Sequence, residues 1–153
     1  MELIYCDGAC KNNPGIGGWG VLINGDIRVG FASFEANTTN NIMELTAAIK
    51  GLEYFQSPTK ICLRSDSKYL INGMSKWVFN WQKNGWKTAS KKDVKNIELW
   101  KKLLLLAGKH NVTWEWVKAH AGIEGNEIAD KLANRAIDLK KSVKIKNPTI
   151  DLL

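Results

Sequence analysis

The chain has 153 residues and a net charge of +7, from 22 basic against 15 acidic residues. This length suits one domain with its own hydrophobic core, and the positive charge favours a polyanionic partner. No apolar run approaches the length of a membrane span and no secretory leader is recognisable, so we expect a soluble, cytoplasmic protein.

The first three predicted elements are strands, over residues 2–6, 20–23 and 27–34. Apolar side chains alternate with a period of two in the first strand, and the sequence Asn-Gly-Asp at residues 24–26 predicts a hairpin turn between the other two. Asp7 follows the first strand directly, although Asp is depleted in strands. Asp7 therefore either begins a turn with the glycine after it or serves a function.

A helix is predicted to begin at Asn41, with Asn41 as the N-cap and Glu44 reaching back to it in a capping box. Taken alone, Glu44 fits this structural role. Ala48 and Gly51 continue a stripe of small residues from Glu44, which would let this side of the helix approach the sheet closely. The same spacing would then place Glu44 beside Asp7.

A fourth strand is predicted over residues 60–65, and a helical segment over residues 67–73 follows it. Asp66 lies between them. It fits the N-cap of that helix, but it also lies at the carboxyl end of a strand, where open α/β sheets bind their ligands.

The next segment, residues 76–102, forms a predicted helical lobe that carries eight lysines against two acids, a net charge of +6. Residues after Leu139 add +3, which leaves −2 for the rest of the chain. Most aromatic rings of the lobe are expected to form a small local core. A lysine-rich lobe with some exposed aromatic surface also fits a nucleic-acid clamp.

A fifth strand over residues 112–117 and a last helix from Glu124 complete the predicted domain. Asp130 in this helix alone fits an exposed acid near the positive end of the helix dipole. His120 lies in the loop before the helix, where a proton carrier would be useful above a metal site.

The predicted fold class is mixed α/β. It has a five-stranded sheet, with three antiparallel strands followed by two parallel ones, flanked by helices and extended by the basic helical protrusion. We expect one domain over residues 1–140 and a flexible basic tail over residues 141–153. No stripe that would drive oligomerisation is visible, so we expect a monomer.

The cysteines indicate neither a disulfide framework nor a zinc site. There are three, Cys6, Cys10 and Cys62, and no C-x-x-C pair. Free thiols in a compact domain fit a reducing compartment.

The four acids, Asp7, Glu44, Asp66 and Asp130, would repel one another if the fold brings them together. Divalent cations would turn this repulsion into a binding site. Oxygen-only ligands suit Mg²⁺, two ions per site are expected at about 4 Å from each other, and Mn²⁺ is the expected substitute.

Four segments of the chain resemble, in order and with similar spacing, the motifs of bacterial-type ribonuclease HI. They are YCDGACKNNPGIGGWG, TTNNIMELTAAIKGLE, RSDSKYLINGMSKWVFNWQKNGWKTASKKDVKNIELWKKL and WEWVKAHAGIEGNEIADKLANRAI. The resemblance covers residues 1–137 without a large gap, and four motifs in sequence are far more specific than one. It implies the ribonuclease H fold and an endonuclease that cuts the RNA strand of RNA–DNA hybrids.

The resemblance implies functional roles for five residues of these motifs. The catalytic, metal-binding carboxylates fall on Asp7 in CDG, Glu44 in MEL, Asp66 in SDS and Asp130 in IAD, and the mobile catalytic histidine falls on His120 in KAHAG.

The resemblance also implies that the basic lobe grips the DNA strand and that residues around the site contact the hybrid. The candidate nucleic-acid contacts are Asn13, Thr39, Asn40, Asn41, Lys68, Trp77, Trp81, Lys83, Trp86, Lys87, Lys91 and Lys92. Ile42 and Ile123 depart from the basic residue and the second histidine that many relatives carry. We expect these departures to affect substrate affinity or cleavage preference and to leave the chemistry intact.

The mechanistic hypothesis is in-line hydrolysis of a phosphodiester, and the resemblance implies products with 5′-phosphate and 3′-hydroxyl ends. Asp7 and Asp130 would hold one ion at the attacking water. Asp7, Glu44 and Asp66 would hold the other at the departing 3′ oxygen. His120 would move protons or assist product release. Recognition through the backbone predicts cleavage that is largely independent of sequence.

Two rival functions remain open at this point. A DNA-cutting nuclease of the same fold would also use a carboxylate set, although the basic lobe and the HAG loop disfavour it. A hybrid-binding module without catalysis is disfavoured because negative charge beside phosphates gives a pure binder no advantage.

Overall fold

The fold is built on one mixed sheet. The structure describes residues 1–153 apart from the side chain of Leu152. In this computed structural model the strands are β1 (Glu2–Cys10), β2 (Gly15–Asn24), β3 (Arg28–Thr38), β4 (Lys60–Ser65), β5 (Asn111–Trp116) and β6 (Val143–Lys146). They follow the order β5-β4-β1-β2-β3-β6 across the sheet. β1, β2, β3 and β6 pair antiparallel, whereas β4 is parallel to both β1 and β5.

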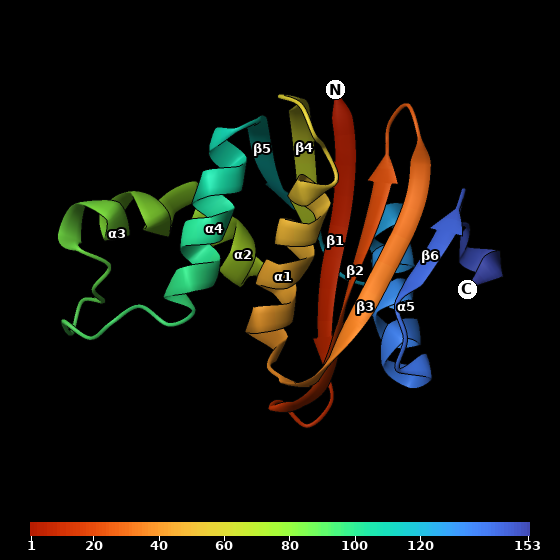
Figure 1. The fold of residues 1–153 in the computed structure, drawn as a ribbon, viewed down its shortest axis with the longest axis horizontal. Coiled ribbons are helices and arrows are strands. Elements are labelled where there is room, and N and C mark those ends of the chain that lie inside the picture. Colours follow the sequence, from red (N-terminus) through yellow and green to blue (C-terminus); the bar gives the residue numbers. More distant parts are fainter.

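Helices cover both faces of this sheet (Figure 1). They are α1 (Asn40–Glu53), α2 (Lys68–Asn72), a π-helical turn (Gly73–Trp77), α3 (Val78–Asn84), α4 (Ile97–Gly108), α5 (Glu124–Leu139) and a short 3-10 turn (Ile150–Leu152). α1 and α4 pack together on one face, and α5 packs on β1, β2 and β3 from the other. The predicted mixed α/β class is confirmed.

Alternation along β1 divides the core into two layers. Ile4 and Cys6 belong to the larger cluster beneath α1 and α4, while Tyr5 belongs to the cluster beneath α5. The period-two pattern of the sequence therefore follows from a strand buried on both faces.

Gly20 on β2 lets α5 lie directly against the sheet. A Cβ atom at this position would stand 2.2 Å from the carbonyl oxygen of Ala129 on α5, so only glycine fits. Gly20 is also the partner of Asp7 across the β1–β2 ladder. This close approach brings the part of α5 that follows Ala129 next to Asp7.

Three local predictions need correction. β1 continues to Cys10, so the alternative of a hairpin turn at Asp7 is wrong. The N-cap of α1 is Thr39, whose side chain accepts a hydrogen bond from the Ile42 nitrogen, and Asn41 lies inside the helix. The helix after Asp66 is capped by Ser67, which accepts from the Leu70 nitrogen.

The predicted count of five strands is also wrong, because β6 adds a sixth. It pairs with β3, with Ile145 opposite Gly30. Val143 and Ile145 alternate with exposed lysines and pack against the α5 side of the sheet. The lysines hide this pattern in the sequence, and the segment that we expected to be a flexible tail is a paired strand in the structure.

The aromatic rings of the basic lobe pack on one another, but as part of the larger core cluster beneath α1 and α4 and not as the separate local core that we expected. Trp100 is fully buried, and its ring lies 5.1 Å from that of Tyr69 and 5.3 Å from that of Trp81. Trp77 and Trp86 each lie 5.9 Å from Trp81. These contacts fix α2, α3 and α4 relative to one another and leave the lobe projecting from one side of the domain (Figure 1).

Candidate active site

Three of the predicted carboxylates meet at one end of the sheet. Asp7 comes from β1, Glu44 from α1, and Asp66 follows β4. Each offers an oxygen atom, and these atoms all lie within 4.8 Å of one another. The convergence expected from separate sequence patterns is present for these three acids.

Glu44 is held in place by the backbone of β1. The Gly8 nitrogen donates a hydrogen bond of 2.5 Å to its Oε1 atom. A Cβ atom on Gly8 would stand 2.5 Å from the Glu44 nitrogen, so glycine is needed for α1 to approach β1 this closely. Glu44 thus serves the site and does not form the capping box that its spacing suggested.

Asp66 and Asp130 are held by amide side chains of α5. Asn126, which is buried, donates from Nδ2 to Oδ2 of Asp66 over 3.2 Å. Asn134 donates from Nδ2 to Oδ1 of Asp130 over 3.2 Å and to the Asp130 carbonyl oxygen over 3.0 Å. Asp130 lies close enough to Asp7 for its carboxylate to act on the ionisation of Asp7.

The buried acids ionise with difficulty. Burial raises the pKa of Asp7 well above its usual range, and the charges of Glu44, Asp66 and Asp130 raise it further. Burial, together with the charge of Asp66, raises the pKa of Glu44 to about 8. Ion pairs among the described residues include none of these four acids. The site therefore has the chemistry of a cation-binding centre.

The comparison with known sequences decides the family. The sequence profile described as RNase H matches residues 1–138.

The chain belongs to the ribonuclease H family.

Individual members of the ribonuclease H family agree with this assignment. "Ribonuclease H" of Francisella philomiragia subsp. philomiragia is 54% identical over 136 residues, which cover 88% of this chain and 90% of that protein. The crystal structure of LC9-RNase H1 superimposes with a TM-score of 0.83 at 30% identity and covers 95% of this chain and 77% of that one. LC11-RNase H1, solved in complex with an RNA/DNA hybrid, shares the fold at 24% identity with a TM-score of 0.71 and covers 91% of this chain and 98% of that one. The family predicted from the motifs is confirmed.

His120 lies in the exposed turn that leads into α5. Its backbone is left-handed, with a φ of 54°. Hydrogen bonds among the described residues do not link it to the acids. Its role as a proton carrier stays a prediction.

Four of the predicted nucleic-acid contacts gather at the start of α1. Oδ1 of Asn13, in the turn after β1, accepts a hydrogen bond of 2.9 Å from the Asn40 nitrogen. Thr39 caps the helix, and Asn41 is exposed on its first turn. The side chains at 13 and 39–41 thus share one surface, and Glu44 follows one turn further along the helix.

Lys68 lies in the first turn of α2, two residues after Asp66, and its contact reveals a residue that the sequence analysis missed. Its Nζ atom lies 5.0 Å from the ring centre of Trp116, a cation–π contact. Trp116 is 43% exposed and donates from Nε1 to the Asp66 carbonyl oxygen over 3.0 Å. The sequence did offer a signal for Trp116, because it is an aromatic residue at the end of the predicted fifth strand.

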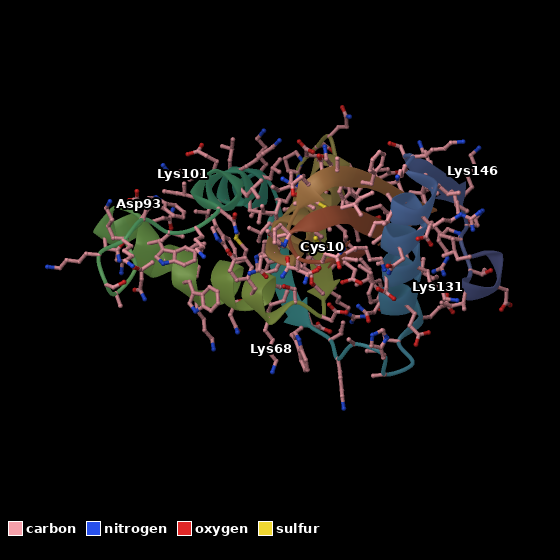
Figure 2. All side chains as sticks on the ribbon, turned by 90° about the horizontal axis from the view of Figure 1, so that it is seen from below. Cys10, Lys68, Asp93, Lys101, Lys131 and Lys146 are labelled. Carbon is pink, nitrogen blue, oxygen red and sulfur yellow. The ribbon has the colours of Figure 1, made fainter. Side chains whose placement is uncertain are left out.

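The predicted contacts of the lobe lie in the part of the chain around α3 and the segment that follows it. Figure 2 looks at the molecule from below the view of Figure 1, with Cys10 near the middle, Asp93 in the lobe on one side and Lys131 of α5 on the other. The predicted contacts Lys83, Lys91 and Lys92 are exposed, and Lys87 forms an ion pair with Asp93.

None of the helices in the described part of the chain is long and apolar enough to cross a bilayer.

Asn126 and Asn134 were also missed by the sequence analysis. They lie four residues before and four residues after Asp130, so α5 carries the three side chains on one stripe. The four-residue spacing can be seen in the sequence, but the contact of Asn126 with Asp66 can be known only from the folded structure.

Proposed function

We propose that this ribonuclease H family member is an endonuclease that hydrolyses the RNA strand of RNA–DNA hybrid duplexes. The observation that carries the proposal is the meeting of Asp7, Glu44 and Asp66 within 4.8 Å, with Asp130 beside Asp7, in a chain of this family. The complex of LC11-RNase H1 supports the substrate, because that protein shares the fold and binds such a hybrid.

The residues of the site fit divalent metal ions. The ligand atoms are carboxylate oxygens, which hard cations such as Mg²⁺ prefer, and the raised pKa values of Asp7 and Glu44 reflect negative charge that the protein does not neutralise. Asp7 and Asp130 would hold one ion, and Asp7 would share the other with Glu44 and Asp66. When bound, such a pair supplies positive charge for the phosphate oxygens and makes a nearby water more acidic. Mn²⁺ would substitute through the same ligands.

The side chains of the site keep the reacting groups in place. Gly8 and Asn126 orient the carboxylates of Glu44 and Asp66 through hydrogen bonds. Water attacks phosphorus in line with the 3′ oxygen, the P–O3′ bond breaks, and the products carry 5′-phosphate and 3′-hydroxyl ends. His120 would carry a proton between the site and solvent, which its exposed position on a turn allows.

The surface at the start of α1 would identify the RNA strand. A hybrid has a wide, shallow minor groove lined by 2′-hydroxyl groups. The side-chain oxygen Oδ1 of Asn13 accepts a hydrogen bond from the Asn40 nitrogen, which leaves the side-chain NH₂ group of Asn13 to donate to a phosphate or base edge. The amide of Asn41 is exposed on the same surface. Contacts of this kind carry little sequence information, so cleavage would be largely independent of sequence.

The basic lobe would hold the DNA strand. Lys83, Lys91 and Lys92 are exposed there, and exposed cations neutralise phosphates and release counterions. Trp77 keeps 37% of its surface exposed, enough for contact with a sugar. Trp81 and Trp86 are half-buried and would act mainly by supporting the lobe.

Comparing labelled duplexes tests this proposal. RNA–DNA, RNA–RNA and DNA–DNA duplexes of one sequence are incubated with the full chain in Mg²⁺, with and without a chelator, and Asp7→Asn serves as the inactive control. We expect cleavage of the RNA strand of the hybrid alone, lost with the chelator. Equal cleavage of DNA–DNA would make the chain a DNA-cutting nuclease, and binding of the hybrid without cleavage would make it a binding module.

A further inference from the structure

We infer that Asn134 is a positioning residue for Asp130, held in its working orientation by Lys11. The inference rests on the proposed function, in which Asp130 is a metal ligand. It adds a residue of α5 and a residue of the turn after β1 to the machinery of the site.

Asn134 uses both ends of its amide. Its Nδ2 atom donates to Oδ1 of Asp130 over 3.2 Å and to the Asp130 carbonyl oxygen over 3.0 Å. Its Oδ1 atom accepts from Nζ of Lys11 over 3.3 Å. A reversed amide would face its oxygen towards the carboxylate and its NH₂ group towards the ammonium, and both contacts would be repulsive. Lys11 therefore selects the orientation in which Asn134 donates to Asp130.

Asp130 needs such a donor more than the other acids do. Glu44 is fixed by the Gly8 nitrogen and Asp66 by Asn126, while Asp7 is buried within a strand. Asp130 is half-buried on α5, and when Asp7 and Asp130 are both ionised their repulsion favours rotamers that turn the Asp130 carboxylate outwards. The bond from Asn134 opposes this rotation.

The bond also leaves the second carboxylate oxygen available. Asn134 occupies Oδ1 of Asp130, so Oδ2 can serve as a ligand to the ion that Asp130 would share with Asp7. Hydrogen bonds to ligating carboxylates orient them, and their loss typically lowers metal affinity. The amide is neutral, so it supplies this orientation without adding a cation that would compete with the metal.

The test is Mg²⁺ binding by the full chain without substrate, measured by calorimetry, for Asn134→Ala and Asn134→Leu. Both variants lose the donor, keep the charge and are better helix formers than Asn, so α5 should persist. We expect Mg²⁺ affinity to fall roughly 10-fold to 100-fold. The unfolding midpoint in chelator should be unchanged or higher, which a merely structural role would not produce.

Activity assays add a second readout. For Asn134→Ala, kcat on the hybrid should fall at low Mg²⁺ and recover as Mg²⁺ is raised, while KM for the hybrid stays within about twofold, because the lost bond concerns metal affinity. Gln56→Ala, which removes an exposed amide outside both the acid cluster and the lobe, is the control and should alter neither value.

The role of Lys11 is tested by Lys11→Met in the wild-type and Asn134→Ala backgrounds. If Lys11 acts through Asn134, its effect on Mg²⁺ affinity differs between the two backgrounds. Equal effects would remove Lys11 from the inference.

Wild-type Mg²⁺ affinity in both Asn134 variants would overturn the inference. Failure of the proposed function would look different, because the wild-type chain would then leave the hybrid uncut, or Asp130→Asn would cut it at the wild-type rate. The Mg²⁺ titration gives its answer in either case.

Discussion

At the scale of single residues, Asp7 is the acid of the site whose burial most disfavours the charged form. It occupies a strand interior, is only 5% exposed and lies among three other acids, so folding without a cation leaves its charge poorly compensated. A sequence selected only for stability would not retain an acid there. Asp7 is therefore the residue at which the functional demand on the chain is most visible.

Substitutions at Asp7 and His120 should lower kcat by different factors, because Asp7 is the proposed metal ligand and His120 the proposed proton carrier. Asp7→Asn should lower kcat about 1,000-fold or more, since under the proposed function it would remove a ligand shared by both ions. His120→Ala should lower kcat only about 100-fold, at the low end for acid–base catalysis. Single-turnover cleavage of a saturating hybrid measures both. A larger loss at His120 than at Asp7 would reverse the assigned roles.

Glu44 should make the stability of the metal-free protein depend on pH. Its pKa rises from 4.5 to about 8 on folding, so between these values the folded state binds more protons than the unfolded state. The free energy of unfolding should then fall as pH rises through this window, with a slope of up to about 1.4 kcal/mol per pH unit. Urea unfolding in chelator at several pH values measures the slope.

Glu44→Gln should reduce this slope, leaving the part that Asp7 contributes, because the pKa of Asp7 is raised too. Glu98→Gln, at an exposed position of α4, should leave the slope unchanged. Identical slopes for wild type and Glu44→Gln would contradict the assignment.

At the scale of elements, the sequence patterns located most strands and helices but did not predict that β6 forms and pairs with β3. Val143 and Ile145 are two apolar residues among lysines, too few to form a distinct period. Their role depends on β3, which lies more than a hundred residues earlier and offers a free ladder edge. A strand that exists only by pairing with a distant partner cannot be identified from its own residues.

The pairing of β6 predicts a contrast between neighbouring residues. Ile145→Ala should lower the free energy of unfolding by about 1 to 2 kcal/mol, because Ile145 is half-buried against the α5 side of the sheet. Lys144→Ala, at an exposed position, should change it little. Denaturant unfolding and hydrogen exchange of amides 143–146 measure the effect. Unprotected amides and no stability change would restore the expectation of a flexible tail.

At the scale of the whole molecule, the acid cluster and the lysine-rich lobe are formed by different parts of the chain. The acids converge where β4 ends beside the middle of β1, while the lobe from residue 76 to 102 carries a net +6. Under the proposed function, the lobe would attract the duplex and so offset the repulsion between the acids and a polyanion. Figure 2 shows the lobe and the tail lysine Lys146 at opposite ends of the molecule.

Removing lobe charge should weaken hybrid binding without affecting chemistry. Lys91→Gln together with Lys92→Gln should raise KM and reduce the slope of log affinity against log salt by about 1 to 2 units, since each lost phosphate contact removes about one. kcat should be unchanged. Lys146→Gln removes a charge at the far end and serves as the control. Equal salt slopes for all variants would show that the lobe does not contact phosphate.

The sequence by itself determined the alternating strands and the basic lobe through local spacing and charge. The family and the four candidate acids came from the resemblance of its motifs to those of ribonuclease HI. Only the tertiary structure decided how the acids are held. Gly8 and Gly20 allow α1 and α5 to touch the sheet, and Asn126 and Asn134 then reach Asp66 and Asp130. Such contacts join residues distant in the chain, so their geometry exists only once the sheet and both helices have packed.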